Sequence, residues 1–207
     1  MYDETYPFLR EHLERQEGVT DKLLGPVRAW NEYVLPLTLP RGSRVLDVGA
    51  CTGSLMNKLQ WVGGYEMYGV DLNDAAIKAG LEMYDDPNLC LATAECLPFP
   101  DDSFDGVISQ DLLEHIPKDS LPLALAEFRR VSRGTRMVHK VTVTEDTEWI
   151  DSDHTHVTKQ NAEWWLMLFE SEGFRVLVDP HKKYLDRWKC FPVLKDMHGY
   201  YLIEAVN

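Results

Sequence analysis

Strand-like and helix-like segments alternate along the chain from residue 44 to about residue 178, and this alternation limits the fold more than any other feature. Each short apolar run is followed by a longer segment whose apolar residues recur at helical spacing. Such alternation is typical of a parallel sheet with crossover helices. The sequence therefore predicts an α/β fold: a doubly wound, seven-stranded sheet, mostly parallel, with an antiparallel last strand.

The ends of the expected helices follow from capping residues. Gly134 is the expected end of the helix that follows the fourth strand, and Gly173 the end of the next helix. Thr158 is the expected N-cap of that next helix. The strands are expected over residues 44–48, 66–70, 89–92, 106–109, 136–143, 174–178 and 199–206.

The residues before the first strand do not fit the alternation. They contain two helix-like segments, which we expect to form a helical cap over residues 1–40 at the carboxyl edge of the sheet. Packing against the side edge of the sheet is an equal alternative. Residues 41–207 would then form the core, and the whole chain of 207 residues a single domain.

Composition narrows the class of partner. The net charge is −13, from 21 basic and 34 acidic residues, and so acidic a surface repels nucleic-acid backbones and anionic lipid. The arginines at 129, 130, 133 and 136 follow helical spacing and are interpreted as a solvated helix face. No apolar run approaches the ~20 residues of a membrane span, and the N-terminus lacks a secretion signal. We therefore expect a cytoplasmic protein that binds neither nucleic acid nor membrane.

The turn after the first strand is the first candidate binding site, because ligands of open α/β sheets bind beyond the carboxyl ends of the strands. It runs from Gly49 to Gly53, and the following helix is expected to offer free N–H donors. A dinucleotide fingerprint requires glycine also at 51 and 54, where this chain has Cys51 and Ser54. Asp47, just before the turn, suits a cationic amine better than a pyrophosphate. The turn therefore favours a ligand without a diphosphate.

Further motifs follow in register at later strand ends. Asp71 ends the second strand, 22 residues after Gly49, where a carboxylate can accept the hydroxyls of a ribose. Leu97-Pro98-Phe99 and Ser103-Phe104-Asp105 precede the fourth strand, and Leu113-Glu114-His115-Ile116 follows it. With these motifs, residues 44–178 resemble the class I S-adenosylmethionine-dependent methyltransferases, especially their small-molecule branch, whose sheet is Rossmann-like.

The resemblance implies a cofactor, S-adenosylmethionine, and a role for each matching residue. The turn would line the methionine part, Asp71 would hold the ribose, and Leu72 would pack on the adenine ring. Cys51 and Thr93 depart from the family, which most often has glycine and aspartate there; Glu95 is the substitute expected for the aspartate. The implied cofactor-binding residues are Asp47, Gly49, Ala50, Gly53, Asp71, Leu72, Thr93, Ala94, Glu95 and Gln110.

The acceptor side is assigned to the polar segment 151–158, between the fifth strand and the next helix. A hydroxyl or protonated amine acceptor needs a base whose pKa lies near the working pH, which histidine provides. We expect His156 or His154 to be this base, oriented by Asp153 or Asp151. The same groups would alternatively bind a metal, which methyl transfer itself does not require. His115 is expected to be structural instead.

The expected activity is thus methyl transfer from S-adenosylmethionine to a small-molecule acceptor, with oxygen favoured over nitrogen as the acceptor atom. Two alternatives stay open: a nicotinamide-dependent oxidoreductase, and a cofactor-binding module of the same fold without catalysis. The sequence leaves the identity of the acceptor and the oligomeric state undetermined.

Overall fold

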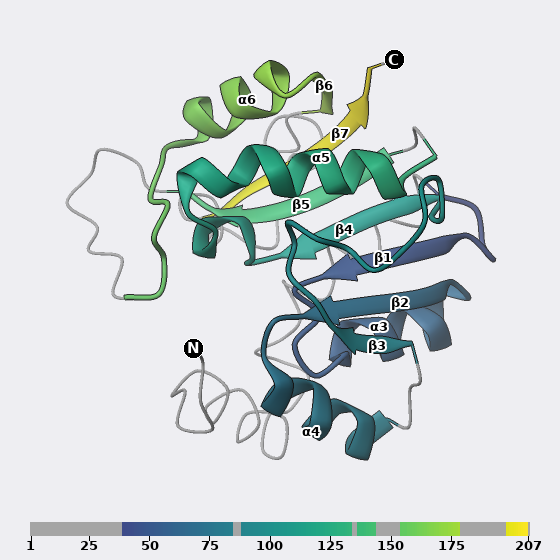
Figure 1. Ribbon diagram of the computed structural model, residues 1–207. Helices are drawn as coiled ribbons and strands as arrows, with labels where there is room; N and C mark the ends of the chain where they lie inside the picture. The colour runs from purple at the N-terminus through teal and green to yellow at the C-terminus, as the bar shows by residue number, and fades with distance from the viewer. Residues whose placement is uncertain (1–38, 85–87, 134–135, 144–153, 179–197, 207) are drawn as a thin grey trace, which may run out of the picture.

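A computed structural model describes residues 39–84, 88–133, 136–143, 154–178 and 198–206 (Figure 1). They form one seven-stranded sheet in the order β3-β2-β1-β4-β5-β7-β6. β7 pairs antiparallel with both β5 and β6, and the other pairs are parallel. The predicted fold class is confirmed. The strands are β1 (Arg44–Val48), β2 (Glu66–Asp71), β3 (Leu89–Leu91), β4 (Gly106–Gln110), β5 (Arg136–Thr142), β6 (Phe174–Val178) and β7 (His198–Ala205).

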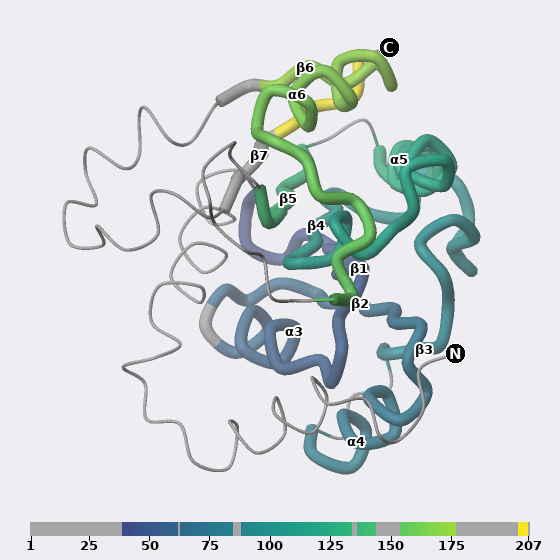
Figure 2. The backbone as a smooth tube through the Cα atoms, turned by 90° about the vertical axis from the view of Figure 1, so that its left-hand side faces the viewer, coloured from purple at the N-terminus to yellow at the C-terminus, as the bar shows by residue number. Residues whose placement is uncertain are grey.

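Helices lie on both faces of the sheet, and Figure 2 shows α3 and α5 on opposite sides of it. A short π-helical turn, η1, continues α3, and two 3-10 turns, η2 and η3, lead from β4 into α5. The helical segments are α3 (Ser54–Lys58), η1 (Leu59–Gly63), α4 (Asp74–Tyr84), η2 (Leu113–His115), η3 (Lys118–Ser120), α5 (Leu121–Val131) and α6 (Ala162–Ser171).

Two apolar clusters, one on each face, hold the helices to the sheet. Because successive strand residues point to opposite faces, Val45 joins the cluster beneath α3 and α4, whereas Leu46 and Val48 join the one beneath α5 and α6. Val45 and Leu46 are fully buried, and each such side chain contributes about 1.5–3 kcal/mol of transfer free energy. β1, which carries the candidate turn, is thus an interior strand, paired with β2 on one side and β4 on the other.

Two predicted helix boundaries are wrong. α5 ends at Val131 because Ser132 turns into extended backbone, so Gly134 is not its end. α6 is capped by Asn161, whose side chain accepts the N–H of Trp164, and not by Thr158. Thr158 is buried, and its hydroxyl instead donates to the carbonyl of Ile116 at 2.7 Å. Gly173, with φ of 78°, follows the end of α6 as expected.

The arginines interpreted as a solvated helix face fit that interpretation only in part, because the exposed ones, Arg133 and Arg136, lie beyond the end of α5. Arg129 donates to the carbonyls of Glu172 and Gly173. Arg133 donates to the carboxylate of Asp105 at 2.8 Å. These groups tie loops to the helix and are already paired, which weakens any reading of them as a nucleic-acid patch.

Parts of the predictions fall on residues that the structure does not describe. The helical cap expected over residues 1–40 lies outside the described residues except for Leu39 and Pro40, as do Asp151 and Asp153. Among the described helices, none combines the length and apolar character that crossing a membrane requires.

The parallel strands all end at one edge of the sheet. Their arrowheads point to the left in Figure 1, and this edge faces the viewer in Figure 2. The turn after β1, Asp71 at the end of β2, and Gln110 at the end of β4 therefore belong to the same edge. Open α/β sheets bind ligands there.

Candidate active site

Three residues of the turn after β1 have left-handed backbone: Gly49 (φ 81°), Cys51 (φ 52°) and Gly53 (φ 74°). Glycine adopts this conformation freely because it has no Cβ, whereas a side chain there costs about 1–2 kcal/mol. Cys51 therefore stands at a position where the backbone favours glycine, in accord with the departure noted in its sequence.

Four backbone N–H groups of this turn, those of Gly49, Ala50, Cys51 and Gly53, donate to acceptors within the protein. Gly49 and Ala50 both donate to the carbonyl of Val70 at 2.9 Å, and Gly53 donates to that of Ala50. Cys51 donates to Asp71 Oδ2 at 2.7 Å. A diphosphate would need several of these donors, so the geometry agrees with the predicted ligand that lacks one.

Asp47 and Asp71 lie close enough at the strand ends to interact. Asp47 is only 2% exposed, and burial together with the Asp71 carboxylate raises its pKa to about 8. Burial also raises the pKa of Asp71, while the N–H groups of Asn73 and Cys51 oppose that rise. A cation near the pair would favour the ionised carboxylates. The pair therefore suits a ligand that carries an ammonium group.

The turn is packed so closely that added side-chain atoms would collide. A Cβ at Gly49 would lie 3.0 Å from Leu112, which follows β4. On the other side, a Cβ at Gly80 of α4 would overlap the carbonyl oxygen of Thr52. Contacts from the end of β4 and from α4 thus fix the backbone of the turn.

The remaining predicted cofactor residues lie beyond the ends of β2, β3 and β4. Leu72 follows β2 and is 57% exposed, which leaves it free to pack on a ring. The segment after β3 is tied to β2, because Ala92 N–H donates to the Asp71 carbonyl at 3.0 Å. It then forms a turn in which the N–H of Cys96 donates to the carbonyl of Thr93. Within this turn Ala94 is buried, whereas Thr93 and Glu95 are half-buried. Gln110, at the end of β4, is also half-buried.

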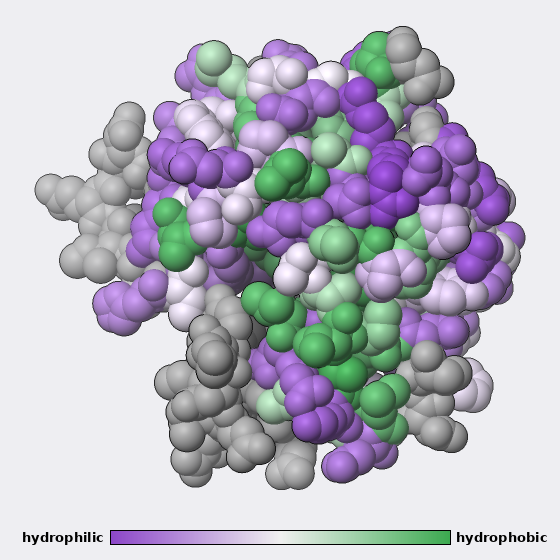
Figure 3. Space-filling view, viewed as in Figure 1, coloured by the Kyte–Doolittle hydropathy of each residue, from purple (hydrophilic) through white to green (hydrophobic). Residues whose placement is uncertain are grey.

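Apolar surface adjoins this side of the edge. Figure 3 shows apolar residues over the part of the molecule that carries β3 and α4. The exposed large apolar residues of that part are Leu72, Leu81, Met83 and Leu91. A flat apolar ring packed on Leu72 would therefore have further apolar surface around it.

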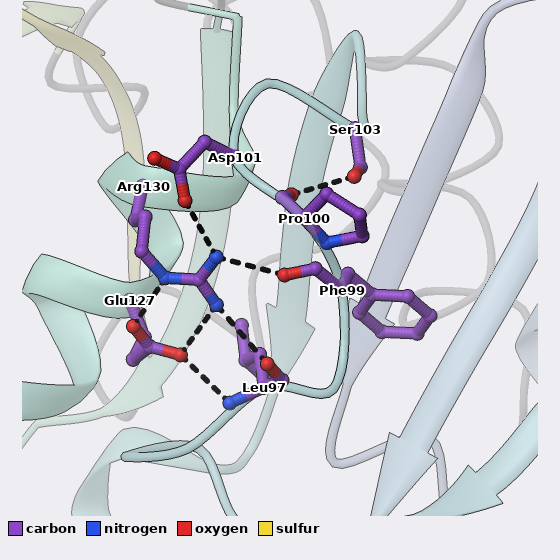
Figure 4. Close-up of polar contacts among 7 residues, drawn as sticks. All are labelled: Leu97, Phe99, Pro100, Asp101, Ser103, Glu127 and Arg130. Atoms are coloured by element: carbon purple, nitrogen blue, oxygen red, sulfur yellow. Dashed lines mark hydrogen bonds and ion pairs between the residues drawn. The ribbon is translucent and has the colours of Figure 1, made fainter.

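An ion-paired cluster that the sequence analysis missed fixes the loop after β3 to α5 (Figure 4). Arg130 donates to the carbonyls of Leu97 and Phe99 and to the carboxylate of Asp101. Glu127 pairs with Arg130 and accepts the N–H of Leu97 at 2.8 Å. The available signal was the i, i+3 spacing of opposite charges on one helix.

On the acceptor side, the structure brings His156 and His115 together. Their ring centroids lie 4.6 Å apart in an edge-to-face arrangement with an interplanar angle of 79°. His115 Nδ1 lies 3.2 Å from the carbonyl oxygen and 3.0 Å from the hydroxyl of Thr155. His154 is exposed, and its predicted carboxylate partners, Asp151 and Asp153, lie outside the described residues.

A second polar pair joins the ends of β4 and β5. Lys140 is 2% exposed, and its Nζ donates to both carboxylate oxygens of Asp111, at 2.5 and 2.6 Å. Asp111 has left-handed backbone with φ of 52°. Trp165 is fully buried and belongs to the core. In the described ranges, no three His, Cys, Asp or Glu side chains gather into a metal-binding group.

Comparison with known proteins agrees with this geometry. Residues 46–135 match a family described as the methyltransferase domain. The chain is also 36% identical over 115 residues to the ubiquinone/menaquinone biosynthesis C-methyltransferase UbiE of Burkholderia mallei, and the same match is found in Burkholderia thailandensis. This match covers 51% of the chain and 46% of the relative, so the chain spans about half the length of the curated relatives it matches.

Solved structures agree in fold. A SAM-dependent methyltransferase from Aquifex aeolicus superposes with a TM-score of 0.65 over 90% of this chain and 96% of that one, at 16% identity. The [4+2]-cyclase SpnF superposes with a TM-score of 0.66 over 86% of this chain and 80% of that one, at 18% identity. At such identities the likeness shows the fold alone.

The residues at the edge fit the cofactor of this family. S-adenosylmethionine carries an ammonium group, a ribose and a flat adenine ring, but no phosphate. The carboxylates of Asp47 and Asp71, the exposed Leu72 and the internally bonded turn match these groups in chemistry. The methyltransferase-domain match over residues 46–135, the curated relatives and the fold agree in their similarity to the class I S-adenosylmethionine-dependent methyltransferases, the family that the sequence motifs resemble.

Proposed function

We propose that the protein transfers the methyl group of S-adenosylmethionine to a small-molecule acceptor at the carboxyl edge of its sheet. The observation that carries this proposal is the pair of interacting strand-end carboxylates, Asp47 and Asp71, beside a turn whose N–H groups are bonded internally. That arrangement favours an amino acid joined to a nucleoside over a dinucleotide, which argues against the nicotinamide alternative. The acidic surface favours a small acceptor over nucleic acid.

In this proposal, Asp71 accepts hydrogen bonds from the ribose. Each of its oxygens already accepts one backbone N–H, from Cys51 and from Asn73, but a carboxylate has about four acceptor sites. The sugar hydroxyls would take the remaining ones. Asp47, the turn, Leu72, the 93–95 segment and Gln110 complete the set of cofactor-binding residues. The bound cofactor supplies an activated methyl group, and the protein positions the acceptor and excludes water.

We propose His156 as the general base that removes the acceptor proton. The bond from His115 Nδ1 to the Thr155 carbonyl requires a proton on Nδ1, because a carbonyl oxygen only accepts. That bond fixes the ring of His115, whose contact with His156 in turn limits the orientation of the second ring. His154 is exposed and lacks this contact, so we favour His156 over it.

A base beside the acceptor favours oxygen over nitrogen as the methylated atom, since a hydroxyl must lose its proton during transfer. Carbon is a second candidate, because the curated relatives are named as C-methyltransferases. A catalytically silent protein is the remaining alternative, and the cyclase among the structural neighbours shows that this fold is also found outside methyl transfer.

Calorimetry and a transfer assay test the proposal. We expect the protein to bind S-adenosylhomocysteine but not NADH, and to transfer radioactive methyl from S-adenosylmethionine to a member of a panel of phenols, alcohols, amines and enolisable ketones. His156→Ala should abolish transfer at unchanged cofactor affinity, whereas His154→Ala should retain it. Tight NADH binding, or equal loss of transfer in both variants, contradicts the proposal.

A further inference from the structure

One buried carboxyl residue, Glu114 in η2, contacts both ends of the connection between β5 and α6. Its side-chain Oε1 accepts the N–H of Thr142, the last residue of β5, at 2.8 Å. Its backbone carbonyl accepts the N–H groups of Val157 and Thr158, at 3.0 and 2.9 Å, just before α6. The connection between these two points contains the histidine of the proposed base.

The contacts of η2 continue beyond Glu114 to the histidine pair. The next residue, His115, bonds to Thr155 and touches the ring of His156. Residues 114 and 115 therefore hold the connection at Thr142, at Thr155 and at residues 157–158. His156 lies between two of these attachments, so its ring position depends on them.

Burying the Glu114 carboxyl group costs more free energy than an attachment by one hydrogen bond would require. Glu114 is 1% exposed, and its second oxygen, Oε2, has no hydrogen-bond partner among the described residues. Burial and the nearby Asp111 carboxylate raise its pKa to about 7. A buried group left half satisfied calls for a reason beyond folding, since structural polar groups are normally fully bonded.

We infer that Glu114 is a positioning residue, which holds both ends of the β5–α6 connection and thereby fixes His156 against His115 on the acceptor side. The consequence for catalysis rests on the proposed function, whereas the attachment itself does not. The amide of glutamine can replace the carboxyl here, because its oxygen still accepts the N–H of Thr142. Alanine has no side-chain acceptor and cannot replace it.

Imidazole NMR of histidine-labelled protein, without cofactor or acceptor, tests the inference. The signals of His115 and His156 are assigned by replacing each with glutamine, and the contact is seen as a shift of one signal when the other ring is removed. We expect this mutual shift in the wild type and in Glu114→Gln, and its loss in Glu114→Ala. The shift should persist in Glu127→Ala, which also removes a carboxyl that accepts a backbone N–H but holds a different loop.

Hydrogen exchange of the wild-type protein provides a measurement that does not depend on the alanine variant folding. The amide protons of Thr142, Val157 and Thr158 should exchange slowly. In Glu114→Ala that of Thr142 loses its acceptor and should exchange about tenfold faster, as expected for loss of a buried hydrogen bond. Val157 and Thr158 keep the backbone carbonyl of residue 114 as their acceptor, and their exchange should accelerate because η2 is no longer attached to β5. Wild-type exchange at the rate of free loops, or a mutual ring shift unchanged in folded Glu114→Ala, overturns the inference. Absence of methyl transfer would contradict only the proposed function.

Discussion

The Asp71 carboxylate accepts the N–H of Cys51 at 2.7 Å, across 20 residues of sequence. This bond joins the end of β2 to the turn after β1. Its other oxygen accepts the N–H of Asn73 at 2.8 Å, just before α4. The Asp71 side chain therefore positions the turn and also faces the proposed ribose position. A substitution of Asp71 should impair both roles together.

Replacing Asp71 with asparagine is expected to weaken S-adenosylhomocysteine binding by about 10- to 100-fold, because one acceptor oxygen becomes a donor facing a backbone N–H. The same change should lower the free energy of unfolding by about 1–3 kcal/mol. Calorimetry and urea unfolding measure the two effects. Asp74→Asn is the control, since Asp74 is exposed and pairs with Lys78 in its own helix. Equal effects of both substitutions would contradict the assigned role.

The strand ends were predictable from the sequence, because apolar runs and the residues that follow them are local signals. Asp47 and Asp71 were located by that rule alone. The bonding of Gly49 and Ala50 to Val70 was not predictable, since it depends on how β1 and β2 pair. Thr158 failed as a cap for a related reason: a buried carbonyl of Ile116 competes for its hydroxyl, and Asn161 takes its place.

Cofactor binding should depend on pH through Asp47. In the free protein its pKa is about 8, so the carboxyl is mostly protonated at pH 6–7. A bound ammonium favours the ionised form, and binding therefore releases a proton. The affinity for S-adenosylhomocysteine should increase about tenfold from pH 6 to pH 7. Calorimetry at pH 7 in buffers of different ionisation enthalpy should detect release of about one proton.

Asp47→Asn provides the matched comparison. Its binding should be weaker and lose this pH dependence. Its stability should change in the opposite sense, because a group whose pKa is raised on folding destabilises the protein as pH rises from about 4 towards 8. At pH 7 the variant should be more stable by on the order of 3 kcal/mol in urea unfolding. A variant that binds with the wild-type pH profile would exclude Asp47 as the amine partner.

Gly80→Ala separates helix propensity from packing. In a helix interior alanine is favoured by about 1 kcal/mol over glycine, so propensity alone predicts stabilisation. In α4, however, the new Cβ overlaps the carbonyl of Thr52 in the cofactor turn, which must shift. We expect destabilisation of about 1–3 kcal/mol and weaker S-adenosylhomocysteine binding. Lys78→Ala, on the exposed side of the same helix, should leave both nearly unchanged. A stabilised Gly80→Ala protein with normal binding would mean that α4 does not support the turn.

His139 should make the fold sensitive to acid. Its ring is fully buried in β5, stacked on Phe128 and Phe169 and bonded through Nδ1 to the Ser109 hydroxyl at 2.8 Å. Nε2 has no hydrogen-bond partner among the described residues. Burial lowers its pKa from 6.5 to about 3. Between these values the unfolded chain binds a proton that the folded protein does not, so stability is lost as pH falls, by up to about 1.4 kcal/mol per pH unit.

The double variant Ser109→Ala with His139→Phe tests this assignment. It removes both polar partners and keeps an aromatic ring between the two phenylalanines, so it should fold at pH 7. Urea unfolding at pH 7, 6 and 5 compares the two proteins. From pH 6 to pH 5 the wild type should lose about 1 kcal/mol more than the variant, because only the wild type excludes a proton from this site. His154→Gln, which removes an exposed histidine instead of the buried one, should retain the wild-type dependence. Parallel curves for wild type and double variant would show that other groups cause the acid sensitivity.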